Sequence, residues 1–320
     1  MYASNNTTAF PGLNVTQCPA VFSEKWVARL APGPLFSPAI ILLQIFTLIT
    51  FHRWHSRDPY LSLHVSLACS SLAYGIIGLS FGITTLNPWS DLVATASRAL
   101  NYLSVFAHNS STTTLLFISL DRWLSVEFPI QYRARISQKK VLFAIAGLWF
   151  VSFLQSVPGM IVYWSAMQAY CNRLTTFFYP SLGFYLWSVL TGPVLLSLTA
   201  LAQLRIITIA VATKLRVVRA RGRIGKKPTH GPAPVELSVL MGIIRERLLA
   251  SVVVVIVQLF ANVPYRITIQ FASRYAWSSQ TMAFWSMAWI SVQHIFSPVV
   301  YLTFFRGFER LRKGSLVSVV

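Results

Sequence analysis

The sequence predicts an all-α membrane protein, a seven-transmembrane helix bundle with a short interfacial eighth helix. This prediction rests on an apolar composition and on seven long stretches without charge. The 320 residues are 55% hydrophobic and only 11% charged, whereas a soluble domain carries about 25% charged residues. The stretches without Asp, Glu, Lys or Arg are 30–52, 59–90, 99–120, 141–172, 174–204, 248–265 and 275–305. Each can supply one spanning helix, which needs roughly 17–25 mostly apolar residues.

We expect the seven helices at 35–54, 60–84, 94–126, 139–163, 179–214, 244–272 and 281–304. The sixth has the shortest uncharged stretch, so it must include neighbours such as Arg266 to cross the membrane. The chain then divides into an outer tail at 1–34, a seven-helix domain at 35–304 with a long inner loop at 215–243, and an inner end at 305–320. In this inner end, apolar residues recur at helical spacing among basic ones, which predicts a helix lying along the inner leaflet.

The basic residues orient the predicted helices. When the helices alternate in direction, 21 of the 27 Lys and Arg residues lie on one side. The positive-inside rule makes this side cytoplasmic. We therefore expect a multi-pass protein of the plasma membrane with its N-terminus outside and its C-terminus in the cytoplasm. The net charge of +19 then reflects inner loops that face anionic membrane lipids, and it does not indicate nucleic-acid binding.

The outer tail carries three N-glycosylation sequons, at Asn5, Asn6 and Asn14. Such sites are used only in the lumen or outside the cell, so they agree with an outer N-terminus. Residues 1–29 contain no sustained apolar core, which predicts that the first helix acts as an uncleaved signal.

The segment from Asp121 to Tyr132 is the most informative part of the chain. It directly follows the uncharged stretch 99–120. An adjacent acid and arginine at the end of a spanning helix are costly to hold in lipid and are usually functional. This segment therefore marks a candidate functional site at the inner end of the third predicted helix.

On these residues the chain resembles a rhodopsin-like G-protein-coupled receptor over nearly its whole length. Asp121-Arg122-Trp123, with Pro129-Ile130 and Tyr132 behind it, is similar to the family's signature on the third helix. The other matches follow in the family's order: Trp149, Pro193, Pro264-Tyr265 and Ser297-Pro298-Val299-Val300-Tyr301. Arg57-Asp58-Pro59-Tyr60 and the Ser-Pro-x-x-Tyr variant are similar to fish odorant-type and some orphan receptors, which favours a divergent, chemosensory member.

The resemblance implies a receptor that binds an extracellular small-molecule ligand and activates a heterotrimeric G protein. It implies that Arg122 pairs with Asp121 at rest and is freed to contact the G protein, while Ile130 inserts into that partner. The alternative for the Asp121–Arg122 pair is a static structural ion pair. The residues implied in coupling and activation are Asp121, Arg122, Trp123, Pro129, Ile130, Tyr132, Pro298 and Tyr301.

The chain departs from the family's pattern at positions that restrain signalling. The second-helix acid that anchors sodium is Ser71, the asparagine of the seventh helix is Ser297, and the tryptophan switch of the sixth helix is Asn262. Leu201 replaces a tyrosine of the fifth helix, and of the sodium pocket only Ser111 remains. We therefore expect no sodium effect. The acidic partner of Arg122 on the sixth helix is also missing, and Glu246 is the nearest substitute. If Glu246 does not reach Arg122, we expect elevated basal signalling.

The cysteines depart from the family as well. The family's usual disulfide partner, near Ser97, is absent, and the chain contains only Cys18, Cys69 and Cys171. Cys18 and Cys171 are both expected outside, in oxidising surroundings. They either pair, tying the tail to the second outer loop, or remain free thiols.

A ligand cavity is expected between the outer halves of helices three, five, six and seven. Arg266 suggests an anionic ligand, because a buried arginine normally needs an anion; alternatively its side chain reaches the outer headgroups. Ser104 stands where amine receptors carry aspartate, which argues against a biogenic amine. The residues expected to face this cavity are Ser104, Val105, His108, Asn109, Tyr185, Asn262, Tyr265, Arg266, Met287 and Ser291.

The sequence also bears on three other classes of protein. An enzyme is excluded because the helices offer no paired carboxylates and no Ser-His-Asp arrangement; no cofactor or metal is expected. A transporter would need ionisable residues at mid-membrane, which the helices almost lack. A non-signalling or constitutively active decoy receptor with the same fold remains the alternative, favoured by the lost switch residues.

Overall fold

The computed structural model describes residues 32–53, 59–86, 91–169 and 190–224, and within the last third of the chain 252–253, 255–257, 259–264, 267 and 289–300. Apart from the short connections at 128 and 136–137, the backbone of these residues is helical. Four helices contain a stretch long and apolar enough to cross a membrane: Leu35–Arg53, Leu61–Thr84, Gln138–Pro158 and Gly192–Ile209. Over the described residues, the prediction of an all-α membrane protein is confirmed.

The helices of the first half follow the predicted spans closely. They are α2 (Pro32–Arg53), α3 (Pro59–Leu86), α4 (Asp91–Glu127) and α6 (Gln138–Ala169), with a short α5 (Pro129–Arg135) between the last two. The sequence did not predict α5, which begins with a proline, a residue well suited to the first turn of a helix. Helix α6 passes Pro158 and ends at Ala169, beyond the expected end at 163. A spanning helix tolerates an internal proline because neighbouring groups bond the freed carbonyl.

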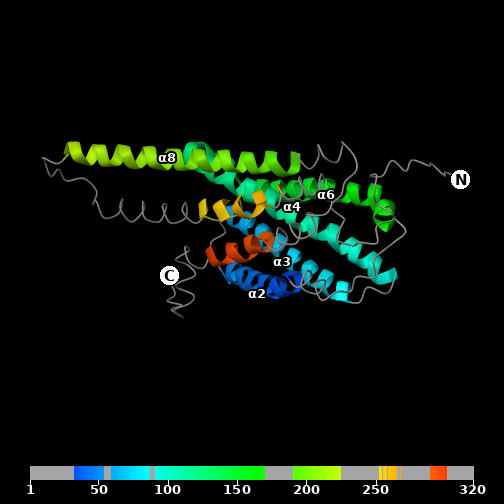
Figure 1. Ribbon diagram of the computed structural model, residues 1–320. Helices are drawn as coiled ribbons and strands as arrows, with labels where there is room; N and C mark the ends of the chain where they lie inside the picture. The colour runs from blue at the N-terminus through cyan, green and yellow to red at the C-terminus, as the bar shows by residue number, and fades with distance from the viewer. Residues whose placement is uncertain are drawn as a thin grey trace.

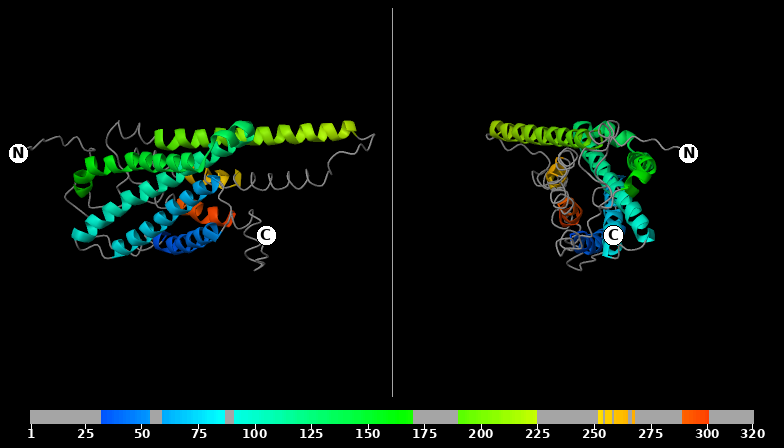
Figure 2. Two further views of the ribbon diagram at one scale, coloured as in Figure 1. Left: turned by 180° about the vertical axis from the view of Figure 1, so that it is seen from behind. Right: turned by 45° about the vertical axis from the view of Figure 1, so that its right-hand side comes forward.

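The described part of the fifth predicted helix begins with a distorted turn and extends past the expected end at 214. A π-helical turn, η1 (Leu190–Val194), contains Pro193 and leads into α8 (Leu195–Ile224). Proline cannot donate the helical hydrogen bond and crowds the preceding turn, and a wider turn relieves both. Helix α8 continues ten residues past 214, so the first part of the inner loop expected at 215–243 is helical, as far as Ile224. Helix α8 therefore projects beyond its neighbours in both views (Figures 1 and 2).

Helix α4 lies at the centre of the bundle and packs against α3, α6 and α8 (Figure 1). It is the longest described helix, and with its run of polar residues from His108 to Thr114 it is less apolar than α2, α3 and α6. That run is buried, and its hydroxyls bond carbonyls one turn earlier, as Thr114 does to Ser110 at 2.6 Å. Polar residues are tolerated here because the bundle, rather than lipid, surrounds them.

Polar pairs join α4 to α6 at two levels. The Asn109 amide donates to the Ser156 hydroxyl at 3.3 Å, and the hydroxyls of Thr113 and Ser152 share a bond of 3.0 Å. Both partners are four residues apart on their helices, so the two bonds lie one turn apart on facing surfaces. Such bonds stabilise helix association in a membrane, where apolar burial alone gives little preference for a partner helix.

Small residues allow α2 and α3 to approach closely. A Cβ atom built on Gly75 would lie 2.9 Å from the Ile40 side chain, and one on Gly78 would lie 2.8 Å from the Ser37 hydroxyl. Glycine at these two positions lets the backbones meet, as small residues do at many membrane helix interfaces. At Gly147 on α6, by contrast, nothing lies within 4 Å of the corresponding atom.

Candidate functional site

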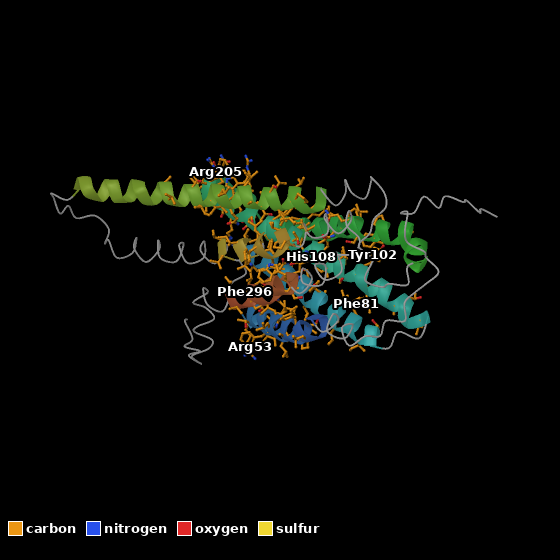
Figure 3. All side chains as sticks on the ribbon, in the orientation of Figure 1. Arg53, Phe81, Tyr102, His108, Arg205 and Phe296 are labelled. Atoms are coloured by element: carbon orange, nitrogen blue, oxygen red, sulfur yellow. The ribbon has the colours of Figure 1, made fainter. Side chains whose placement is uncertain are left out.

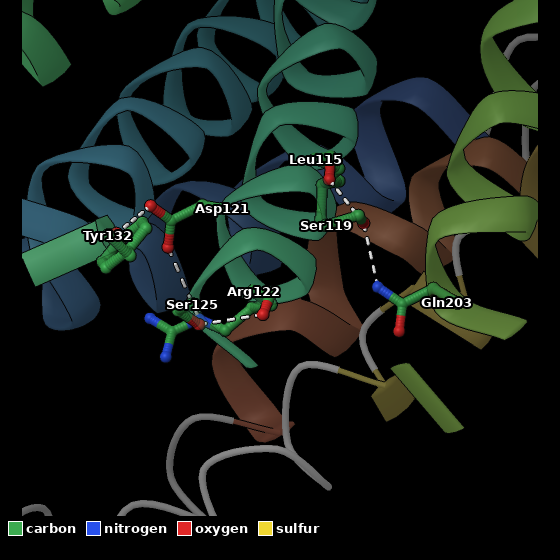
Figure 4. A network of polar contacts seen from close by, with 7 residues as sticks. All are labelled: Leu115, Ser119, Asp121, Arg122, Ser125, Tyr132 and Gln203. Atoms are coloured by element: carbon green, nitrogen blue, oxygen red, sulfur yellow. Dashed lines mark hydrogen bonds and ion pairs between the residues drawn. The ribbon is translucent and has the colours of Figure 1, made fainter. Parts of the chain in front are cut away.

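The inner end of α4 holds Asp121 and Arg122 in the arrangement expected from the sequence. Arg122 Nε lies 3.8 Å from Asp121 Oδ2, with 16% and 11% of the two side chains exposed. The Tyr132 hydroxyl, on α5, donates a hydrogen bond to the other carboxylate oxygen of Asp121 (Figure 4). Asp121 thus ties the arginine to the short helix behind it, and two neighbouring groups share the carboxylate's charge.

Helix α5 places an exposed isoleucine beside a tyrosine that is held by a hydrogen bond. Burial, and then the hydrogen bond to Asp121, raise the pKa of Tyr132. The phenol therefore stays protonated and remains a donor to Asp121. Ile130, two residues before Tyr132, is 84% exposed. An exposed isoleucine beside a fixed tyrosine is available to a partner protein at the inner surface.

A second polar group at this end joins α4 to α8 and was not predicted. Arg205 Nη2 lies 2.6 Å from Glu127 Oε1, its Nε donates to Oε2 at 3.3 Å, and the Trp123 indole N–H donates to the same carboxylate. The bonds from Arg205 and then from Trp123 lower the pKa of Glu127, so this carboxylate is ionised at cytoplasmic pH. The sequence contains both charges, but it does not show that these two helix ends are neighbours.

In the interior, a continuous chain of hydrogen bonds crosses three helices. His108 Nε2 and Asn262 Oδ1 are 3.0 Å apart, the Asn262 amide donates to Gln293 Oε1 at 2.5 Å, and the Gln293 amide donates to Ser111 at 3.4 Å. His108 lies in the middle of the bundle (Figure 3), and all four side chains are buried. Asn262, where the family's pattern has tryptophan, therefore acts as the central link of this chain.

A second buried group lies beside this chain. His294 Nδ1 and the Ser71 hydroxyl share a bond of 2.9 Å, and the Tyr74 ring stacks on His294 with ring centroids 4.2 Å apart. From α2, the Gln44 amide donates to the His294 carbonyl at 2.7 Å and to the Ser297 hydroxyl at 3.4 Å. Ser71 is therefore engaged by a histidine at the position where the family's pattern has a sodium-anchoring acid.

A small cavity of about 10 Å³ lies at this level, lined by Leu67, Ser71, Ser111, Leu115, Val257, Gln293, Phe296 and Ser297. That is about the space of one water molecule. Its polar lining is made of hydroxyls and an amide, and the described residues contain no cluster of three or more His, Cys, Asp or Glu that could hold a metal ion. The cavity suits a neutral guest, because no charged group lines it to compensate a buried cation.

The structure separates the expected ligand-facing residues into groups. His108 and Asn262 lie within hydrogen-bond distance of each other. Ser291 is buried in the helical segment 289–300, and Ser104 and Val105 are half-buried on α4. Asn109 was also expected to face the cavity. In the structure its amide bonds Ser156 on α6, and its side chain is turned from that of His108 by about 100° around the helix. Leu201, 61% exposed, lies outside the interior.

Several expected site residues lie outside the part of the chain that the structure describes. Pro298 is described and buried. Those not described are Asn5, Asn6, Asn14, Cys18, Cys171, Tyr185, Glu246, Tyr265, Arg266, Met287 and Tyr301.

Comparison with known proteins identifies the class of protein that this fold and site define. The model of the family "7 transmembrane receptor (rhodopsin family)" matches residues 42–301. The chain therefore belongs to the rhodopsin family of seven-transmembrane receptors. This membership confirms the predicted multi-pass helical membrane fold, and it confirms that the chain is a receptor and not an enzyme.

Individual relatives are similar in sequence to parts of the chain. Dopamine receptor 4 of Caenorhabditis elegans is 28% identical over 245 residues, covering 70% of this chain and 44% of that receptor. Muscarinic acetylcholine receptor M1 of Sus scrofa is 35% identical over 170 residues, covering 48% of this chain and 36% of the receptor. Muscarinic acetylcholine receptor M3 of Pongo pygmaeus is 34% identical over 104 residues, covering 31% and 17%. The matched region thus spans less than half the length of each of these relatives.

Proposed function

We propose that this protein is a G-protein-coupled receptor of the plasma membrane, with its N-terminus outside, that binds a small-molecule ligand and activates a heterotrimeric G protein. The observation that carries this proposal is the inner end of α4, where Arg122 is paired with Asp121 and Asp121 accepts a bond from Tyr132. Membership of the rhodopsin family supports it.

Coupling would use residues that the inner surface already offers. An outward movement of the sixth helix would expose Arg122, which a static ion pair would not require. Ile130 is exposed and held beside Tyr132, so it can enter an apolar pocket of the G protein with little rearrangement. Burial of one such side chain contributes roughly 1.5–3 kcal/mol.

For the ligand we propose a small molecule that is not a biogenic amine, although the relatives are named as dopamine and muscarinic acetylcholine receptors. Ser104 stands where amine receptors carry aspartate, and in the described interior His108 and Asn262 offer neutral hydrogen-bonding groups. In the sequence, Arg266 supports an anionic group on this ligand, and the likeness to odorant-type receptors supports a chemosensory role.

A second candidate function keeps the fold and loses regulated signalling. In a decoy or constitutively active receptor, the restraints on Arg122 are weak. Asn262 at the switch position favours this candidate, because it bonds His108 and Gln293 in place of a bulky aromatic side chain. A decoy activates no G protein, and a constitutively active receptor activates one to the same extent with and without ligand, whereas the first candidate responds to its ligand.

The test is a panel of G-protein dissociation assays in cells, measured without ligand and with a screen of small organic acids. Arg122→Ala is compared with wild type, and Arg53→Ala, an exposed arginine at the inner end of α2, is the control. We expect basal activation of at least one G protein in wild type and in Arg53→Ala, and its loss in Arg122→Ala at equal surface expression. Equal signalling in Arg122→Ala and wild type contradicts the proposal.

A further inference from the structure

The contact between Glu127 on α4 and Arg205 on α8 has features that a structural ion pair does not require. Both Glu127 oxygens are engaged by Arg205, at 2.6 Å and 3.3 Å, and the Trp123 indole also donates to this carboxylate. The chain has 27 basic residues and only 8 acidic ones, and α8 contains no acid at all. Because acidic residues are so few, the contact of Glu127 with α8 is not expected from random placement of charges.

The two helices are joined at two levels by contacts of different kinds. Deeper in the membrane, the buried Gln203 amide donates to the Ser119 hydroxyl at 2.9 Å (Figure 4). At the inner edge, the Arg205 side chain is 54% exposed. Residues two apart on a helix, such as Gln203 and Arg205, point in nearly opposite directions. Arg205 therefore contacts Glu127 only because its side chain is long enough to extend around α8. The inner contact can therefore open while the buried one remains.

On α4 the three contacting residues form one stripe. Ser119, Trp123 and Glu127 are spaced by four positions, so they lie along one face of the helix, and this face meets α8. Asp121 and Arg122 lie beside this stripe, and Asp121 accepts a hydrogen bond from Tyr132 on α5 (Figure 4). Moving the inner end of α8 away from Trp123 and Glu127 would therefore widen the inner surface next to Arg122 without first breaking the Asp121–Arg122 pair.

We propose that Glu127, Arg205 and Trp123 form a latch that holds the inner ends of α4 and α8 together in the resting receptor and opens on activation, an inference that rests on the proposed function above. Glu127 and Arg205 are positioning residues in this scheme, since they set the place of α8 and contact no ligand. A partly exposed pair is weak, which suits a contact that must open reversibly. Its loss should raise the ratio of open to closed molecules about two- to fivefold.

The first test measures the position of α8 directly and does not depend on signalling. Spin labels are placed at the exposed positions Lys139 and Val211 in a Cys69→Ser background, and distances are measured by double electron–electron resonance without ligand. A sample without the two introduced cysteines measures label on the native ones. We compare wild type, Glu127→Gln, Arg205→Gln and the charge swap Glu127→Arg with Arg205→Glu. Thr208→Val, at an exposed residue that bonds only its own helix, is the control.

We expect one distance distribution in wild type and in Thr208→Val, and an added longer component in each single variant. The charge swap should return the distribution toward wild type, which a role in packing alone would not produce. The proposal is overturned if the single variants leave the distances unchanged, or if the swap fails to restore them.

The same variants are then measured for basal G-protein dissociation at equal surface expression. We expect Glu127→Gln and Arg205→Gln to raise basal activation in proportion to the longer distance component. If the distances respond while wild type and every variant activate no G protein, the latch stands and the proposed coupling fails. If Arg122→Ala abolishes signalling while the distances never change, the coupling stands and the latch fails.

Discussion

Asn262 illustrates how single residues shape the interior of this receptor. Its amide oxygen meets His108 and its amide nitrogen meets Gln293, so a short polar side chain joins three helices where the family's pattern has a tryptophan. In a membrane interior no water replaces a lost hydrogen bond, and an unsatisfied polar group is costly. A substitution that breaks these hydrogen bonds should therefore lower the stability of the receptor as well as alter its signalling.

Asn262→Leu tests this at the residue scale. The substitution leaves His108 and Gln293 without this partner, so we expect a loss of about 1–2 kcal/mol of stability, from two membrane hydrogen bonds. Thermal unfolding of the purified receptor in detergent measures the effect. Val263→Leu is the matched control, because Val263 is 42% exposed and is not part of the hydrogen-bond chain. Equal unfolding midpoints in Asn262→Leu and wild type would show that these hydrogen bonds contribute nothing to stability.

At the scale of elements, the close approach of α2 and α3 depends on two glycines, and the joining of α4 to α6 depends on paired hydroxyls and amides. Both follow from the same constraint. Helices in lipid gain little from burying apolar surface, so tight backbone contact and interhelical bonds select the partner. The long α8, by contrast, contacts α4 and then extends beyond the other described helices (Figure 2).

Gly75→Leu is expected to force α2 and α3 apart, because even a Cβ there would lie 2.9 Å from Ile40. Overpacking of this kind costs typically 1–3 kcal/mol, and we expect a lower unfolding midpoint and less receptor at the cell surface. Gly147→Leu is the control, since nothing lies within 4 Å of that site and the helix gains a better helix former. If Gly75→Leu and Gly147→Leu lower the unfolding midpoint equally, the effect comes from replacing a glycine and not from the contact between α2 and α3.

At the scale of the whole molecule, the polar groups divide into an uncharged interior and a charged inner end. Among the described residues, the ion pairs Asp121–Arg122 and Glu127–Arg205 both lie at the inner end of α4. The interior chain and the cavity beside Ser71 contain amides, hydroxyls and histidines. This division keeps charge near one end of the bundle, where water can compensate it.

We expect this receptor to show no specific response to sodium. Ser71 replaces the acid that would hold the ion, it is bonded to His294, and the adjoining cavity is about the size of one water molecule. Thermal unfolding in sodium chloride should match that in choline chloride at equal ionic strength. A midpoint that rises with sodium and saturates would contradict this expectation.

The sequence by itself determined the membrane class, the family and, among the described residues, the segments that become helices. Length, hydropathy and the order of the motifs are local properties, and the first four spans lie within a few residues of where they were expected. The paired state of Asp121 and Arg122 was also predictable, because the two residues are adjacent.

Only the tertiary structure decided which distant side chains meet. Glu127 and Arg205 are 78 positions apart, His108 and Asn262 are 154 apart, and nothing in the spacing of either pair requires contact. The bond from Asn109 to Ser156 on α6 is another contact that the spacing of the residues does not predict. Helix packing sets the facing surfaces, so partners across helices emerge only when the bundle is assembled.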